Sequence, residues 1–198
     1  MNFSDSFLQG LSHITDIDGY DHMLFLLALC AVYEWQHVKR VAILVTAFTI
    51  GHSVTLIFAS LDGTAWLPSE IIEFLIPVTI GLTCIYNLIA VSRIRRWTVE
   101  KESPGPKYML ALLFGLIHGF GFSNYFRMIS MEGEGYVANL FGFNLGVEIG
   151  QLAIVVVILT ITFIFLNVFR VRQRDWTVLL SGIALGITFL LLRDTWPF

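Results

Sequence analysis

Four of the five histidines in this sequence lie in or beside apolar segments, where an ionisable side chain is unusual. His22, His52 and His118 fall inside apolar runs, Asp21 directly precedes His22, and His13 lies just before the first run. Imidazole and carboxylate without thiolate form a ligand set suited to nickel, zinc, copper or iron, and poorly suited to calcium or magnesium. The residue types therefore indicate a site for a transition-metal ion.

A second group of polar side chains follows one face of a later apolar run. Asn144, Glu148 and Gln151 are spaced i, i+4 and i+7, which places them on one helical stripe. A histidine that binds metal usually has its other ring nitrogen oriented by a hydrogen-bond partner. Five residues could give this support, namely Asp18, Thr49, Ser53, Asn144 and Gln151. The fifth histidine, His37, lies beside Lys39, and we expect it to be solvated.

The apolar segments that carry these residues are long enough to cross a membrane. The chain has 198 residues, of which 56% are hydrophobic and 14% charged, against about 45–50% and about 25% in soluble domains. A helix needs about 20 residues to cross roughly 30 Å of hydrocarbon. Six runs approach or exceed this length, at residues 21–35, 41–60, 67–91, 108–126, 137–169 and 177–193. We expect a single transmembrane domain over residues 1–198, an all-α bundle of about six membrane-spanning helices.

The distribution of cationic residues predicts the orientation of this bundle. Lysine and arginine are enriched in cytoplasmic loops. With both termini outside, only Arg127 and Arg193 fall on the outer side. Ten fall on the inner side, namely Lys39, Arg40, Arg93, Arg95, Arg96, Lys101, Lys107, Arg170, Arg172 and Arg174. His52 and His118 then lie about 15–17 Å above the inner ends of their helices, near the middle of the bilayer. The net charge of −3 argues against a nucleic-acid partner.

Glycines at four-residue spacing predict where helices approach one another closely. Such faces let helix backbones pack closely in a membrane. Three sets occur, at Gly142, Gly146 and Gly150, at Gly115 and Gly119, and at Gly182 and Gly186. They could serve packing within the chain or between chains, so a homo-oligomer is possible.

The segments that carry the polar residues also resemble a known family. HITDIDGYDH at residues 13–22, FTIGHSVTL at 48–56, FGLIHGFGF at 114–122 and FNLGVEIGQ at 143–151 are similar, in this order, to blocks of the HupE/UreJ proteins. The resemblance implies a multi-pass protein of a bacterial inner membrane, of the kind that includes nickel or cobalt permeases supplying hydrogenase and urease. Carried over by position, the metal-associated residues are His13, Asp21, His22, His52, His118 and Glu148.

Two function classes fit these observations. The first is a permease, or a metal-binding transport protein, for a divalent transition metal of the nickel or cobalt type. Its weakness is the inner half of the bundle, where only Thr79, Thr83 and Asn87 offer polar groups for ion release. The alternative is an intramembrane zinc hydrolase that acts on a lipid or lipoprotein at the outer face, with Glu148 or Asp21 as general base. We expect a transporter rather than an enzyme.

Overall fold

The part of the chain that the structure describes is helical. A computed structural model describes residues 2–17, 19–62, 68–93, 104–130 and 135–197, and it contains no strand within these ranges. The elements are α1 (Phe3–Thr15), α2 (Asp21–Cys30), a short 3-10 helix (Trp35–His37), α3 (Val38–Asp62), α4 (Ser69–Arg93), α5 (Pro104–Ser130), α6 (Tyr136–Asn167) and α7 (Gln173–Asp194). The all-α prediction is confirmed, and each predicted apolar segment contains a helix.

Four of the described helices are long and apolar enough to cross a membrane. These spans are Trp35–Phe58, Ser69–Ser92, Tyr136–Asn167 and Gln173–Asp194. Two shorter apolar helices, Asp21–Cys30 and Lys107–Gly121, accompany them. The protein is therefore a helical membrane protein.

The first helix, α1, was not predicted from the sequence. Asn2 caps it, because the Asn2 side chain accepts from the Asp5 backbone N–H at 2.9 Å and Asp5 accepts in return from the Asn2 backbone N–H at 3.3 Å. This reciprocal pair is a capping box, which satisfies two free donors at a helix start. The expectation that His13 precedes the first helix was wrong, since His13 lies in the last turn of α1.

Helix α2 is shorter than the predicted segment 21–35 and lies at the centre of the bundle. It contacts α4, α6, α7 and α1, and most of its side chains are buried. Its free carbonyl groups at the C-terminal end are bonded by α4 and α7, because Asn87 donates to Ala28 O at 2.8 Å and Thr177 donates to Ala31 O at 2.8 Å. A helix can end inside an apolar bundle only when such groups find partners.

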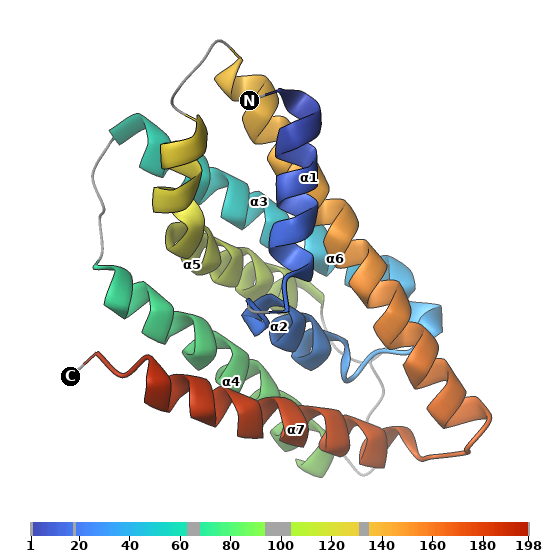
Figure 1. Cartoon of the computed structure of the whole chain (residues 1–198). Helices are drawn as coiled ribbons and strands as arrows, with labels where there is room; N and C mark the ends of the chain where they lie inside the picture. The colour runs from blue at the N-terminus through green and yellow to red at the C-terminus, as the bar shows by residue number, and fades with distance from the viewer. Residues whose placement is uncertain (1, 18, 63–67, 94–103, 131–134, 198) are drawn as a thin grey trace.

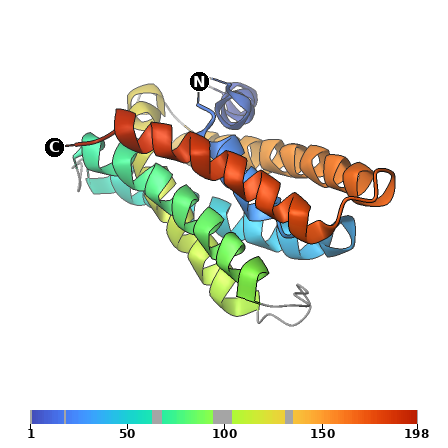
Figure 2. The same cartoon turned by 90° about the horizontal axis from the view of Figure 1, so that it is seen from below.

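Three helix pairs surround α2. Helix α3 packs along α5, α1 along α6, and α4 along α7, and Figures 1 and 2 both show α7 running beside α4. Glycines form two of these contacts, as predicted. A Cβ atom on Gly146 would overlap the carbonyl oxygen of Phe7 in α1, and one on Gly115 would overlap the carbonyl oxygen of Phe48 in α3.

The third predicted glycine face does not pack within the chain. No described atom outside the local helix lies within 4 Å of a Cβ built on Gly182 or Gly186. Close packing at these two positions therefore does not occur within the described chain, because α7 meets α4 through other positions, and packing between chains stays a prediction. Residues Leu180, Ser181, Ala184 and Thr188 are the buried ones there.

The two ends of the bundle differ in charge. Both termini, the C-terminal ends of α3 and α5, and the N-terminal ends of α4 and α6 lie along the top and the left side of Figure 1. The opposite end, here called the basic end, carries the described cations Lys39, Arg40, Lys107, Arg170, Arg172 and Arg174. Arg172 Nε donates to Asp175 Oδ2 at 2.7 Å, and this hydrogen bond raises the pKa of the Arg172 guanidinium above its usual value.

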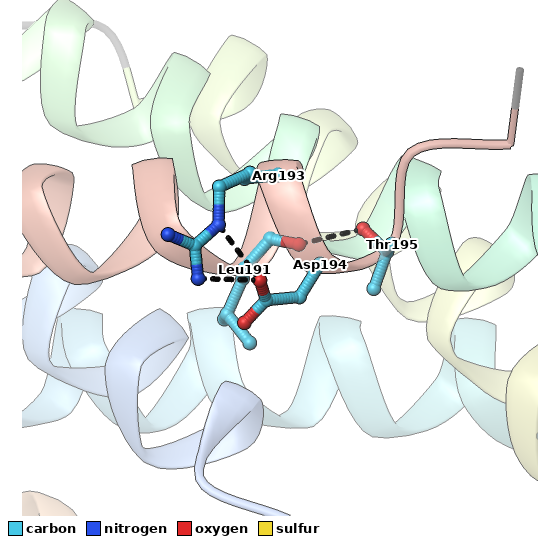
Figure 3. Close-up of polar contacts among 4 residues, drawn as sticks. All are labelled: Leu191, Arg193, Asp194 and Thr195. Atoms are coloured by element: carbon cyan, nitrogen blue, oxygen red, sulfur yellow. Dashed lines mark hydrogen bonds and ion pairs between the residues drawn. The ribbon is translucent and has the colours of Figure 1, made fainter.

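The end of α7 near the termini is capped locally. Thr195 Oγ1 donates to the carbonyl oxygen of Leu191 at 2.8 Å, as Figure 3 shows. Arg193 pairs with Asp194, with Nη2 at 2.8 Å from Oδ1. Because a carboxylate neutralises Arg193, this end of the bundle gains little positive charge from it.

Candidate metal site

Four helices bring four histidines together where the chain breaks between α1 and α2. His13 comes from α1, His22 from the first turn of α2, His52 from α3 and His118 from α5. Ring centroids are 4.8 Å apart for His13 and His22, 5.4 Å for His22 and His118, and 6.2 Å for His13 and His52. The prediction that these side chains from separate segments meet is confirmed.

Aromatic side chains enclose this cluster. The Phe48 ring lies 5.0 Å from His118 and 6.4 Å from His52, and the Phe143 ring lies 6.3 Å from His52, between centroids. Both phenylalanines are buried, as are His52 and His118, which expose 0% and 2% of their surface. The enclosure excludes bulk water, so polar atoms inside must find partners within the protein or in a bound ion.

His118 is held in a tautomer suited to metal binding. Its Nδ1 lies 2.8 Å from the carbonyl oxygen of Phe114, one turn earlier in α5. A carbonyl oxygen only accepts, so Nδ1 must carry the proton and Nε2 must present its lone pair. Nε2 is buried and has no hydrogen-bond partner among the described residues. Its lone pair is therefore available to an ion.

Asp21 lies directly beside the His22 ring. Asp21 Oδ1 is 3.0 Å from His22 Nδ1, although the alignment is not that of a hydrogen bond. The same oxygen accepts from the His22 backbone N–H at 2.9 Å. A carboxylate behind a histidine is a common support for a metal ligand. His22 Nε2 is buried without a hydrogen-bond partner in the described part of the chain.

The His52 ring, like that of His22, has no hydrogen bond in the described structure. Both of its ring nitrogens are buried and lack a hydrogen bond to any described residue. Asn144 lies close enough to interact electrostatically with His52, but no well-aligned hydrogen bond forms. Leaving a buried polar group unpaired costs about 1–3 kcal/mol. A ligand that bonds to the His52 ring would remove this cost.

The histidines lie close to one another, but they do not form a complete metal site in the described structure. Within the described ranges, no three histidine, cysteine, aspartate or glutamate side chains are already arranged to hold a metal. A metal–nitrogen bond of about 2.0–2.1 Å puts a ring centre about 3 Å from the ion, so two ligand rings can be about 6 Å apart. The separations of 4.8 Å and 5.4 Å lie within this limit, whereas the 6.2 Å between His13 and His52 slightly exceeds it.

The remaining predicted residues form a second polar layer between α3 and α6. Thr49 Oγ1 donates to Gln151 Oε1 at 2.8 Å, and Thr46 Oγ1 donates to Glu148 Oε1 at 2.6 Å. Thr49 and Thr46 precede His52 by three and six residues, about 4–5 and 9 Å nearer the basic end. The structure thus places Glu148 beside Thr46, with no bond to a histidine in the described ranges.

Ser53 and Asp18 were both predicted to support the histidines. Ser53 Oγ donates to its own helix at Thr49 O, 2.7 Å away, and does not reach a histidine ring through that bond. Asp18 lies outside the described residues. Thr46 was missed, because a threonine in an apolar helix usually bonds its own backbone. The signal for Thr46 was its spacing: Thr46 and Thr49 are three residues apart, as are Glu148 and Gln151, so two such pairs can form between the two helices.

Comparison with known proteins identifies the family. The model of the HupE / UreJ protein family matches residues 1–193, nearly the whole chain. The chain belongs to the HupE/UreJ family. HupE/UreJ proteins are generally membrane proteins related to nickel and cobalt transport. No curated protein and no solved structure gives a significant match to the chain.

Proposed function

We propose that this HupE/UreJ protein is a permease for a divalent transition metal of the nickel or cobalt type. The observation that carries the proposal is the set of buried Nε2 atoms of His22, His52 and His118, which lack partners in the described structure. An ion bound to these nitrogens would replace the missing hydrogen bonds. The proposed ligands are those three histidines with His13, and Asp21 supports His22.

The proposed orientation puts both termini outside the bacterial inner membrane. Helix α1 has 13 residues and α2 has 10, so together they extend about 35 Å, enough to cross the bilayer. We infer that they form one interrupted crossing, and that α3 to α7 add five more. Transporters commonly bind ions at such breaks near the bilayer midplane. His13 and His22 flank this break.

The second polar layer gives the ion a route inward. In this proposal the ion leaves the histidines past Thr49 and Gln151, then Thr46 and Glu148, toward the basic end. Glu148 Oε2 is buried and lacks a hydrogen-bond partner in the described structure, so it can accept a passing cation. The groups on α4 suit this role less, because Thr83 donates to Thr79 O at 2.9 Å and Asn87 holds the end of α2.

A flux measurement tests the permease. Proteoliposomes with a metal-sensitive dye inside should report influx of Ni²⁺ or Co²⁺, and His52→Ala should reduce the rate at least tenfold. His37→Ala is the matched control, because His37 lies on the 3-10 helix near the basic end. Stoichiometric retention of zinc without influx would instead favour the hydrolase. That alternative is less supported, since Asp21 already contacts His22 and Glu148 already bonds Thr46.

Glu148→Gln should separate ion release from ion binding. Because Glu148 lies in the second layer, we expect equilibrium metal affinity within about twofold of the wild type and influx reduced at least tenfold. Isothermal titration and the liposome assay measure the two quantities. Glu73→Gln is the control, since Glu73 is an exposed carboxylate on α4. A parallel loss of affinity and influx would contradict the separation and make Glu148 a ligand of the histidine site.

A further inference from the structure

A large apolar cavity lies between α4 and α5 and has α2 as its floor. Its volume is about 380 Å³, within the range of about 300–1,000 Å³ typical of ligand pockets. The apolar lining includes Phe25 and Leu29 of α2, Leu82 and Ile89 of α4, and Leu110 and Phe114 of α5. The cavity is separate from the histidine cluster, although Phe25 borders both.

The cavity interior offers little to a polar ligand. Thr83 and Asn87 also line it, but Thr83 donates to Thr79 O and Asn87 donates to Ala28 O. Leu82, Ile89 and Leu110 are each more than 40% exposed, so the cavity opens on the surface that faces lipid. An apolar chain entering from the bilayer matches these walls.

A lysine lines the cavity near the basic end. Lys107, in the first turn of α5, places Nζ 5.3 Å from the ring centre of Tyr33 and 5.6 Å from that of Tyr86. Two aromatic faces stabilise an ammonium by cation–π attraction and fix its position. Tyr33 and Tyr86 are cavity-lining residues as well. The charge is therefore held beside the apolar space.

We propose that this cavity binds one anionic phospholipid, with an acyl chain inside and the phosphate at Lys107. The charge decides the occupant, because the proposed orientation puts the basic end on the cytoplasmic side, where a lysine beside an apolar pocket attracts anionic headgroups. The bound chain would join the α4–α7 pair to the α3–α5 pair.

Only the side chain of Phe25 would separate the lipid from His118. The Phe25 ring centroid is 5.6 Å from that of His118, and Phe114 supplies the carbonyl oxygen that fixes the His118 tautomer. Both phenylalanines line the cavity. Filling the cavity therefore supports the wall that positions His118.

Lipid titration of the full chain tests the proposal independently of metal transport. Native mass spectrometry in detergent, with added phosphatidylglycerol or phosphatidylcholine, should show one retained phosphatidylglycerol per chain. Lys107→Gln should weaken phosphatidylglycerol binding about fivefold and leave phosphatidylcholine unchanged. Lys39→Gln is the control, because Lys39 is an exposed lysine at the same end of the bundle.

A variant that fills the cavity tests lipid binding without changing the charge of Lys107. Thr83→Phe keeps Lys107 but occupies the apolar space, so it should abolish retention of both lipids while circular dichroism shows an unchanged helix content. Equal retention of the two lipids by the wild type would overturn the proposal. So would an equal effect of Lys39→Gln and Lys107→Gln, unchanged retention in Thr83→Phe, or a second copy of the chain in place of lipid.

Discussion

His52→Phe is expected to abolish high-affinity metal binding while leaving the metal-free protein as stable as the wild type or more stable. The two effects have opposite signs because His52 has two buried ring nitrogens without hydrogen bonds in the described structure. A phenylalanine removes that cost of about 1–3 kcal/mol. Its ring can stack as the imidazole does, between Phe48 and Phe143 at centroid distances of 6.4 and 6.3 Å.

Thermal unfolding with and without metal measures both effects. The wild type should gain about 2.7 kcal/mol of stability at a metal concentration of 100 times Kd, and His52→Phe should gain nothing. His37→Phe, outside the cluster, should keep the full gain. A His52→Phe protein that still gains stability from metal, or whose metal-free melting temperature falls by several degrees, would show that His52 serves the fold and not an ion.

The sequence was sufficient for the histidine cluster and for most helices. Histidines inside apolar segments cannot face lipid at low cost, so His22, His52 and His118 had to face inward and toward one another. Helix α1 was not predicted because it is short and mixed in polarity, and windows of about 20 residues pass over it. The capping pair of Asn2 and Asp5 was the local signal for its start.

The partners of individual polar groups could not be predicted from the sequence. Glu148 shares a helical stripe with Asn144 and Gln151, and the pattern alone favours a common site. The structure separates them by depth, because α6 carries Asn144 beside His52 while Glu148 meets Thr46 further along α3. Which residue of α3 stands opposite Glu148 depends on how the two helices are shifted along their axes, and periodicity within one helix does not contain that information.

Helix register is most tightly constrained where glycine lets two backbones touch, and the pair α3–α5 is the sensitive one. A Cβ on Gly115 would overlap the Phe48 carbonyl oxygen and approach the Phe48 carbonyl carbon to 2.8 Å. These are backbone atoms, so no side-chain rotation relieves the overlap. Gly115→Ala must therefore push apart the helices that carry His52 and His118.

Gly115→Ala is expected to destabilise the protein by about 3 kcal/mol, at the upper end of overpacking effects, and to weaken metal binding at least tenfold. Gly186→Ala is the matched control, because its Cβ meets no described atom within 4 Å outside its own helix. Alanine there should leave metal affinity unchanged and raise helix stability by up to about 1 kcal/mol. Unfolding in detergent and metal titration compare the two variants. Equal stability and equal affinity would mean that α3 and α5 do not approach as closely as the described geometry requires, and the distance between His52 and His118 would then be set by other contacts.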